Sequence, residues 1–79
     1  MPKGLNNWSF DDVIAFLKDH GFEFLENRKG SHQAWINRTT EAIVETNFHG
    51  AKSFSIRTLE TMIRQSKIDK KGWRSWAGS

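Results

Sequence analysis

The sequence contains no cysteine, so disulfide bonds and thiolate metal sites are excluded. It also contains no apolar run that approaches the ~20 residues of a membrane-spanning helix, and its first ten residues lack the apolar core of a signal peptide. These absences predict a cytoplasmic protein that is not attached to a membrane. A chain of 79 residues suffices for one small domain and leaves little room for an enclosed cofactor cavity. We therefore expect a single domain over residues 1–79, with any active site on an open surface.

The chain carries a small excess of positive charge. Its formal net charge is +3 at pH 7, and the excess lies in residues 41–79. This balance suits a partner that carries phosphate groups, but many proteins without such a partner share it. Charge alone therefore assigns no function.

The first helix is marked at both ends. Ser9 is placed to cap its start, and Asp12, three residues further on, is placed to return the bond in a variant of the capping box. Gly21 is placed to supply a left-handed cap at its end. Between these residues, apolar side chains follow helical spacing at Phe10, Val13, Ile14 and Leu17.

Three strands are predicted next, at residues 22–26, 31–37 and 41–48, with a turn at 27–30 and a loop at 38–40. The short connections favour an antiparallel meander. Alternation places His32 on one face of the second strand with Ala34 and Ile36, and Ser31, Gln33 and Trp35 on the other. The residues alone leave open which of these faces is covered.

A second amphipathic helix is expected to begin after Ser53 or Ser55 and to end near Lys67, with a stripe at Ile56, Leu59, Met62 and Ile63. Residues 1–7 form a lead-in, 8–68 the core and 69–79 a basic tail with Trp73 and Trp76. These tryptophans either stack on nucleic-acid bases or pack on the domain. The order α-β-β-β-α predicts an α+β fold in which two helices cover one face of a three-stranded antiparallel sheet and leave the other face open.

Several kinds of site find no support in the sequence. The histidines at positions 20, 32 and 49 lack metal-binding spacing, so no metal and no other cofactor is predicted. Glu41 and Glu45 share a face of the third predicted strand, which is typical of a solvated strand edge. Ser31 and His32 do not form a nucleophilic dyad, because neighbours on a strand point to opposite faces.

Histidine acid–base chemistry on a basic surface remains as a candidate. A histidine exchanges protons near neutral pH, and RNA suits this chemistry because it carries its own nucleophile, the 2′-hydroxyl. A positioned acid or base accelerates such a reaction by ~100- to 10,000-fold. From spacing alone, His32 is either this catalytic group or an ordinary exposed strand histidine.

Three stretches stand out: HGFEFLENRKGSH at residues 20–32, FHGAK at 48–52 and TLETMIRQSKI at 58–68. Two motifs within them occur in an order and at a spacing that are fairly specific. The three stretches resemble the HicA family of small bacterial toxins, also described as YcfA-like, which act as mRNA interferases. The resemblance covers roughly residues 9–68. The chain departs from the family in one respect, since Thr46-Asn47-Phe48 lacks the proline that often precedes the second histidine.

The resemblance implies a double-stranded-RNA-binding-like fold and a ribonuclease toxin that a HicB-type antitoxin neutralises. It assigns the catalytic histidine of a Gly-Ser-His motif to His32. RNA contacts are then expected from the residues around it and from the loop after the third strand: Arg28, Lys29, Gly30, Ser31, His49 and Lys52. The expected partners are mRNA and the antitoxin, with no direct contact to DNA. The alternatives are an RNA-binding module without catalysis and a protein-interaction domain.

Overall fold

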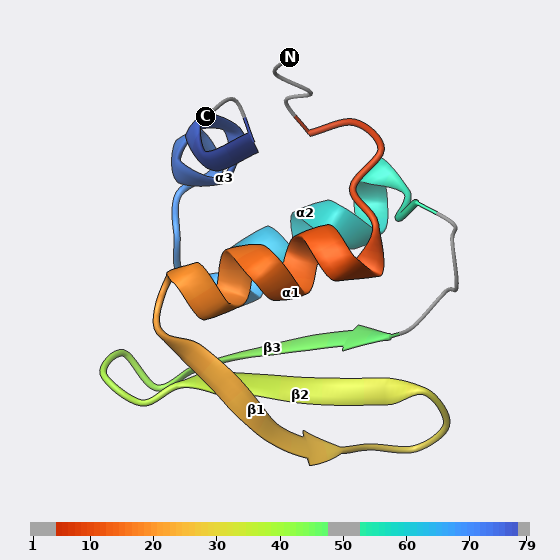
Figure 1. The fold of residues 1–79 in the computed structure, drawn as a ribbon, viewed down its shortest axis with the longest axis vertical. Coiled ribbons are helices and arrows are strands. Elements are labelled where there is room, and N and C mark those ends of the chain that lie inside the picture. Colours follow the sequence, from red (N-terminus) through yellow and green to blue (C-terminus); the bar gives the residue numbers. More distant parts are fainter. Residues whose placement is uncertain (1–4, 48–52, 78–79) are drawn as a thin grey trace.

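A computed structural model describes residues 5–47 and 53–77 of the chain. Its elements, in chain order, are α1 (Phe10–Asp19), β1 (Phe22–Asn27), β2 (His32–Asn37), β3 (Ala42–Asn47), α2 (Ile56–Ser66) and α3 (Lys70–Ala77). The strands form one antiparallel sheet in the order β1-β2-β3, and α1 and α2 lie on the same side of it (Figure 1). The predicted α+β fold is confirmed, its order is consistent with a double-stranded-RNA-binding-like fold, and α3 extends it at the C-terminal end.

The start of α1 is fixed by the predicted capping box. The Asp12 backbone N–H donates to Ser9 Oγ at 3.2 Å, and the Ser9 backbone N–H donates to Asp12 Oδ2 at 2.9 Å. Two N–H groups that the helix leaves without partners are thereby satisfied. The neighbouring segment is anchored as well, because the Phe54 N–H donates to the Trp8 carbonyl at 2.8 Å.

Replacing Ser9 by alanine is expected to lower the free energy of unfolding by about 1 kcal/mol, because the cap to Asp12 is lost. Urea denaturation followed by circular dichroism measures the change. Ser75→Ala, at an exposed position in α3, is the matched control and is expected to leave stability nearly unchanged. Equal stability of the two variants would show that the capping box contributes nothing.

The end of α1 is joined by a hydrogen bond to the turn that connects β2 and β3. Gly21 follows the helix with φ +86°, the left-handed conformation predicted for it. The Asn37 side chain donates to the His20 carbonyl at 3.1 Å and accepts from the Thr39 and Thr40 N–H groups. One side chain thus organises both the helix end and the turn.

The strand register decides which face of the sheet is covered. Trp35 pairs with Val44, and both are buried in the core that also includes side chains from α1 and α2. Because side chains alternate along a strand, His32 lies on the opposite face. The question that the sequence left open is therefore answered: His32 and its neighbours Ala34 and Ile36 are on the face away from the helices.

Two strands begin one residue later than predicted. Ser31 belongs to the turn before β2, and Glu41 belongs to the turn before β3. Glu41 has φ +65°, and its N–H donates to the Asn37 carbonyl at 2.7 Å. The prediction that Glu41 and Glu45 share one strand is therefore wrong, because a left-handed residue closes the hairpin instead of extending it.

The core reaches past residue 68 into α3. Trp73 is fully buried, and its ring stacks on Phe16 with a centroid distance of 4.0 Å and lies 5.3 Å from that of Trp8. Its indole N–H donates to Ser66 Oγ at 3.1 Å. Of the two interpretations of the tail tryptophans, packing on the domain is the one that Trp73 follows. Trp76 is partly buried, and its indole N–H donates to Asp19 at 2.8 Å.

Candidate functional site

A tight turn connects β1 to the first residue of β2. The Arg28 N–H donates to the His32 carbonyl at 2.8 Å, which closes the turn. Gly30 has φ +70°, a conformation that residues with a side chain rarely adopt. A Cβ at Gly30 would meet only His32 Cδ2, at an ordinary 3.9 Å. The conformation of the turn, and not a shortage of space, therefore favours glycine in the Gly-Ser-His motif.

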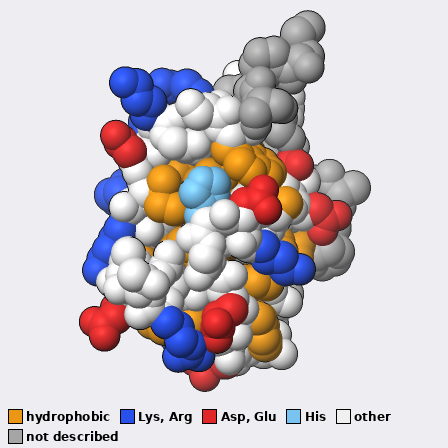
Figure 2. Space-filling model, turned by 60° about the vertical axis from the view of Figure 1, so that its left-hand side comes forward, with side chains coloured by type: hydrophobic (Ala, Val, Ile, Leu, Met, Phe, Trp, Pro, Cys, Tyr) orange, Lys and Arg blue, Asp and Glu red, His pale blue; other side chains and the backbone are white. Residues whose placement is uncertain are grey.

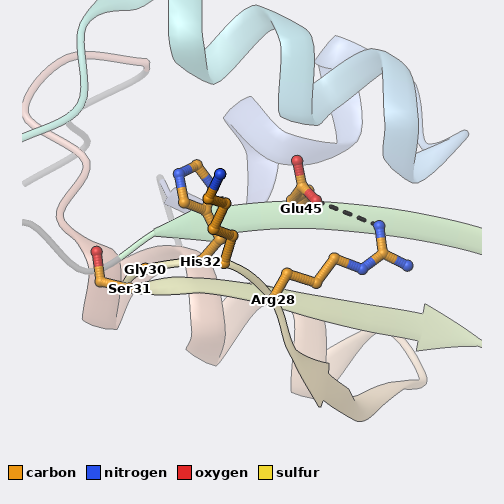
Figure 3. A pocket seen from close by; sticks show the side chains of 6 residues that line it. Arg28, Gly30, Ser31, His32 and Glu45 are labelled. Carbon is orange, nitrogen blue, oxygen red and sulfur yellow. Dashed lines mark hydrogen bonds and ion pairs between the residues drawn. The ribbon is translucent and has the colours of Figure 1, made fainter.

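The turn borders an open pocket of about 470 Å³ on the uncovered face of the sheet. Figure 3 shows His32 rising from the start of β2 and Glu45 from β3, with Arg28 reaching Glu45 from the turn. The His32 side chain is exposed to solvent. The residues that line the pocket are Arg28, Lys29, Gly30, Ser31, His32 and Glu45.

The guanidinium of Arg28 is held by two carboxylates. Its Nε lies 3.0 Å from Glu26 Oε2, and its Nη1 lies 3.2 Å from Glu45 Oε2. The hydrogen bonds that Arg28 donates to Glu26 first, and then to Glu45, raise the pKa of Arg28 above its usual value. All three side chains are partly exposed to solvent, so these ion pairs are weak and salt-dependent.

The ion pairs of Arg28 flank a buried residue on the open face, Ala34. Ala34 has no exposed surface, although it lies away from the helices. In the sheet it pairs with Glu26 on one side and with Glu45 on the other. Arg28 donates hydrogen bonds to both of these carboxylates and so links the residues on either side of Ala34. The small side chain at this position leaves room for the bridge.

Among the described residues that line the pocket, Lys29 is the other cationic side chain besides Arg28. Its side chain is exposed, and within residues 5–47 and 53–77 it forms no ion pair. An ammonium group of this kind is available to an incoming phosphate without first leaving a carboxylate. Lys29 and Arg28 therefore differ in what a phosphate ligand must displace.

The structure brings together five of the residues predicted from the sequence: Arg28, Lys29, Gly30, Ser31 and His32. His49 and Lys52 lie outside the described residues. Glu45 was not predicted as a site residue, because the sequence indicated only a solvated strand edge. Its place beside the pocket follows from the β2–β3 register, which pairs it with Ala34, and no local motif encodes that register.

The other described histidine belongs to a different environment. His20 lies at the end of α1, where its Nδ1 is 2.8 Å from the Phe16 carbonyl and its ring stacks on the Phe16 ring at 4.0 Å. Figure 2 shows a histidine ring among hydrophobic side chains on the side of the molecule that lies at the left of Figure 1.

Across the described residues, no three histidine or carboxylate groups gather in a way that would hold a metal ion. None of the helices in this part of the chain is long and apolar enough to cross a membrane.

Comparison with known families identifies the chain. A family model described as the HicA toxin of bacterial toxin-antitoxin matches residues 10–68. This chain belongs to the HicA toxin family. The match runs from the start of α1 to just beyond α2 and includes every residue that lines the pocket.

The HicA match leaves two parts of the core outside it. Trp8 precedes the matched residues, and Trp73 in α3 follows them, yet both rings pack against Phe16 inside the matched region. Searches among curated proteins and among solved structures found no match to this HicA-family chain. A function for this chain is therefore inferred from the family model and from the geometry of the pocket.

Proposed function

We propose that this HicA-family toxin is an endoribonuclease that cleaves mRNA without a metal ion, with His32 as the general base. The observation that carries the proposal is the position of His32. It is an exposed imidazole on the open face of the sheet, in a pocket that also contains Lys29 and Arg28. This pocket lies within the residues that match the toxin family.

Cleavage of RNA by its own 2′-hydroxyl needs an acid–base group and cations near the phosphate, and this pocket contains both. His32 takes the proton of a 2′-hydroxyl, and the oxygen attacks the adjacent phosphorus while the bond to the 5′-oxygen breaks. The protonated His32 then returns the proton to that 5′-oxygen. Lys29, and Arg28 once it leaves its carboxylates, stabilise the negative charge that builds on the phosphate oxygens. The products are a 2′,3′-cyclic phosphate and a free 5′-hydroxyl.

The open pocket also provides a simple route to neutralisation. The family implies a partner antitoxin, and we infer a HicB-type protein that covers His32. RNA and antitoxin then compete for one surface. An antitoxin complex that still cleaves RNA at the rate of the free toxin would contradict this occlusion.

The proposed reaction predicts both metal independence and a particular product. With the purified protein and an end-labelled mRNA fragment, cleavage is expected to continue at an undiminished rate in EDTA. The upstream fragments are expected to end in a 2′,3′-cyclic phosphate, which polynucleotide kinase with 3′-phosphatase activity converts to a hydroxyl and so changes their mobility. His32→Ala, purified in parallel, controls for contaminating ribonucleases.

Two results would count against the reaction as written. Loss of cleavage in EDTA with recovery on adding Mg²⁺ or Mn²⁺ would indicate a metal-dependent enzyme. Fragments with a 3′-hydroxyl and a 5′-phosphate would indicate attack by water, because an internal 2′-hydroxyl attack cannot form them.

A further inference from the structure

Among the residues of the described part of the chain that line the pocket, Glu45 is the one carboxylate. It comes from β3, whereas the other lining residues come from the β1–β2 turn and the start of β2. In the structure its carboxylate is occupied by Arg28 Nη1 at 3.2 Å. The catalytic reaction proposed above assigns no role to this group.

The register places Glu45 within reach of His32. His32 pairs with Asn47, and Ala34, two residues along β2 on the same face, pairs with Glu45. His32 and Glu45 are therefore diagonal neighbours on adjacent strands, a separation of about 7–8 Å that long side chains bridge. Figure 3 shows both side chains rising from the same face of the sheet.

We propose that Glu45 is a positioning residue for His32 and that binding of an RNA phosphate to Arg28 releases it for this role. The proposal rests on the proposed ribonuclease function. In the free protein, Arg28 bonds Glu26 and Glu45. A guanidinium binds a phosphate through two parallel hydrogen bonds, and its partly exposed ion pairs are weak enough to be exchanged for that contact.

Release of Glu45 has a direct chemical consequence. Its carboxylate turns to the imidazole and accepts a hydrogen bond from the ring N–H that does not face the substrate. A carboxylate in this position orients the ring and favours the imidazolium that forms when His32 takes the proton of the 2′-hydroxyl. Glu45 remains ionised throughout, and the proton passes from His32 to the leaving 5′-oxygen.

Glu26 provides a matched control for Glu45. It also bonds Arg28, at 3.0 Å, but it comes from β1 and does not line the pocket. Removing either carboxylate frees Arg28 from one ion pair. Of the two carboxylates, Glu45 lines the pocket together with His32 and Glu26 does not, so the two variants separate release of Arg28 from positioning of His32.

The test compares Glu45→Gln with Glu26→Gln in RNA cleavage measured from pH 5 to 9 with a short defined RNA. We expect Glu45→Gln to lower kcat about 10-fold and to move the acid limb of kcat to lower pH by roughly 0.5–1 unit. Glu26→Gln is expected to keep both values. Glu45→Asp, which retains the charge, is expected to keep the acid limb in place.

The outcomes distinguish this inference from the function on which it rests. If Glu45→Gln and Glu26→Gln show the same kcat and the same pH profile, Glu45 only holds Arg28 and the positioning role is wrong. If His32→Ala cleaves the same RNA as fast as the unmodified protein, the ribonuclease mechanism itself fails. Melting temperatures of the glutamine variants, at partly exposed positions, are expected to agree within a few degrees, which excludes unfolding as the cause of a lower kcat.

Discussion

Replacing His32 by alanine is expected to lower the rate of RNA cleavage by ~100- to 10,000-fold, the contribution of a positioned acid or base. The imidazole is exposed at the start of β2 and faces the pocket, so its loss removes the proton acceptor and leaves no core cavity. Stability is therefore expected to change little. The measurement is the initial rate of cleavage of a defined RNA under conditions in which both proteins are folded.

His20 supplies the control for the His32 variant. It is the other described histidine, and it is engaged with Phe16 at the end of α1. His20→Gln, assayed below its melting temperature, is expected to keep the cleavage rate within about twofold. Equal large losses in both variants would point to a general effect on folding, and the assignment of His32 as the base would then lack support.

Replacing Trp73 by alanine is expected to lower the free energy of unfolding by about 3–5 kcal/mol, the usual cost of removing a large buried aromatic side chain. Trp73 is fully buried and contacts Phe16 and Trp8. It also donates to Ser66 Oγ. A domain of this size has a total stability of about 4–12 kcal/mol, so the variant is expected to be marginal at 37 °C.

Thermal unfolding followed by circular dichroism measures the effect of Trp73→Ala. A loss of about 3 kcal/mol corresponds to a drop in Tm of roughly 12 °C or more for a domain of this length. Trp73→Phe, which keeps a ring against Phe16 but loses the bond to Ser66, is expected to cost less. A Tm of Trp73→Ala within a few degrees of the unmodified protein would mean that α3 does not contribute to the core.

The elements inside the family-matched region were predictable because their signals are local. Ser9 and Asp12 lie at the spacing of a capping box, and Gly21 lies where a left-handed residue ends a helix. The turn before His32 is likewise encoded by its glycine. In each case a few neighbouring residues determine the conformation, so a sequence pattern suffices.

The covered face of the sheet could not be predicted, because it depends on contacts between distant segments. Alternation groups His32 with Ala34 and Ile36, which read as an apolar set. Only the pairing of Trp35 with Val44 shows that the opposite face meets the helices. Ala34 is buried on this open face, where Arg28 bonds the two carboxylates that flank it.

The third helix and Glu45 were missed for related reasons. α3 spans eight residues and contains Gly72, and a helix this short is marginal by itself. It forms against Trp8 and Phe16, and the spacing of Trp73 and Trp76 was the available signal. Glu45 joins the pocket through a strand register that no motif specifies.

The most direct test of the central claim is single-turnover cleavage of one RNA in EDTA by the unmodified protein and by His32→Ala. We expect cleavage by the unmodified protein, fragments that end in a 2′,3′-cyclic phosphate, and a rate at least about 100-fold lower for the variant. Cleavage by His32→Ala at the rate of the unmodified protein would contradict this claim.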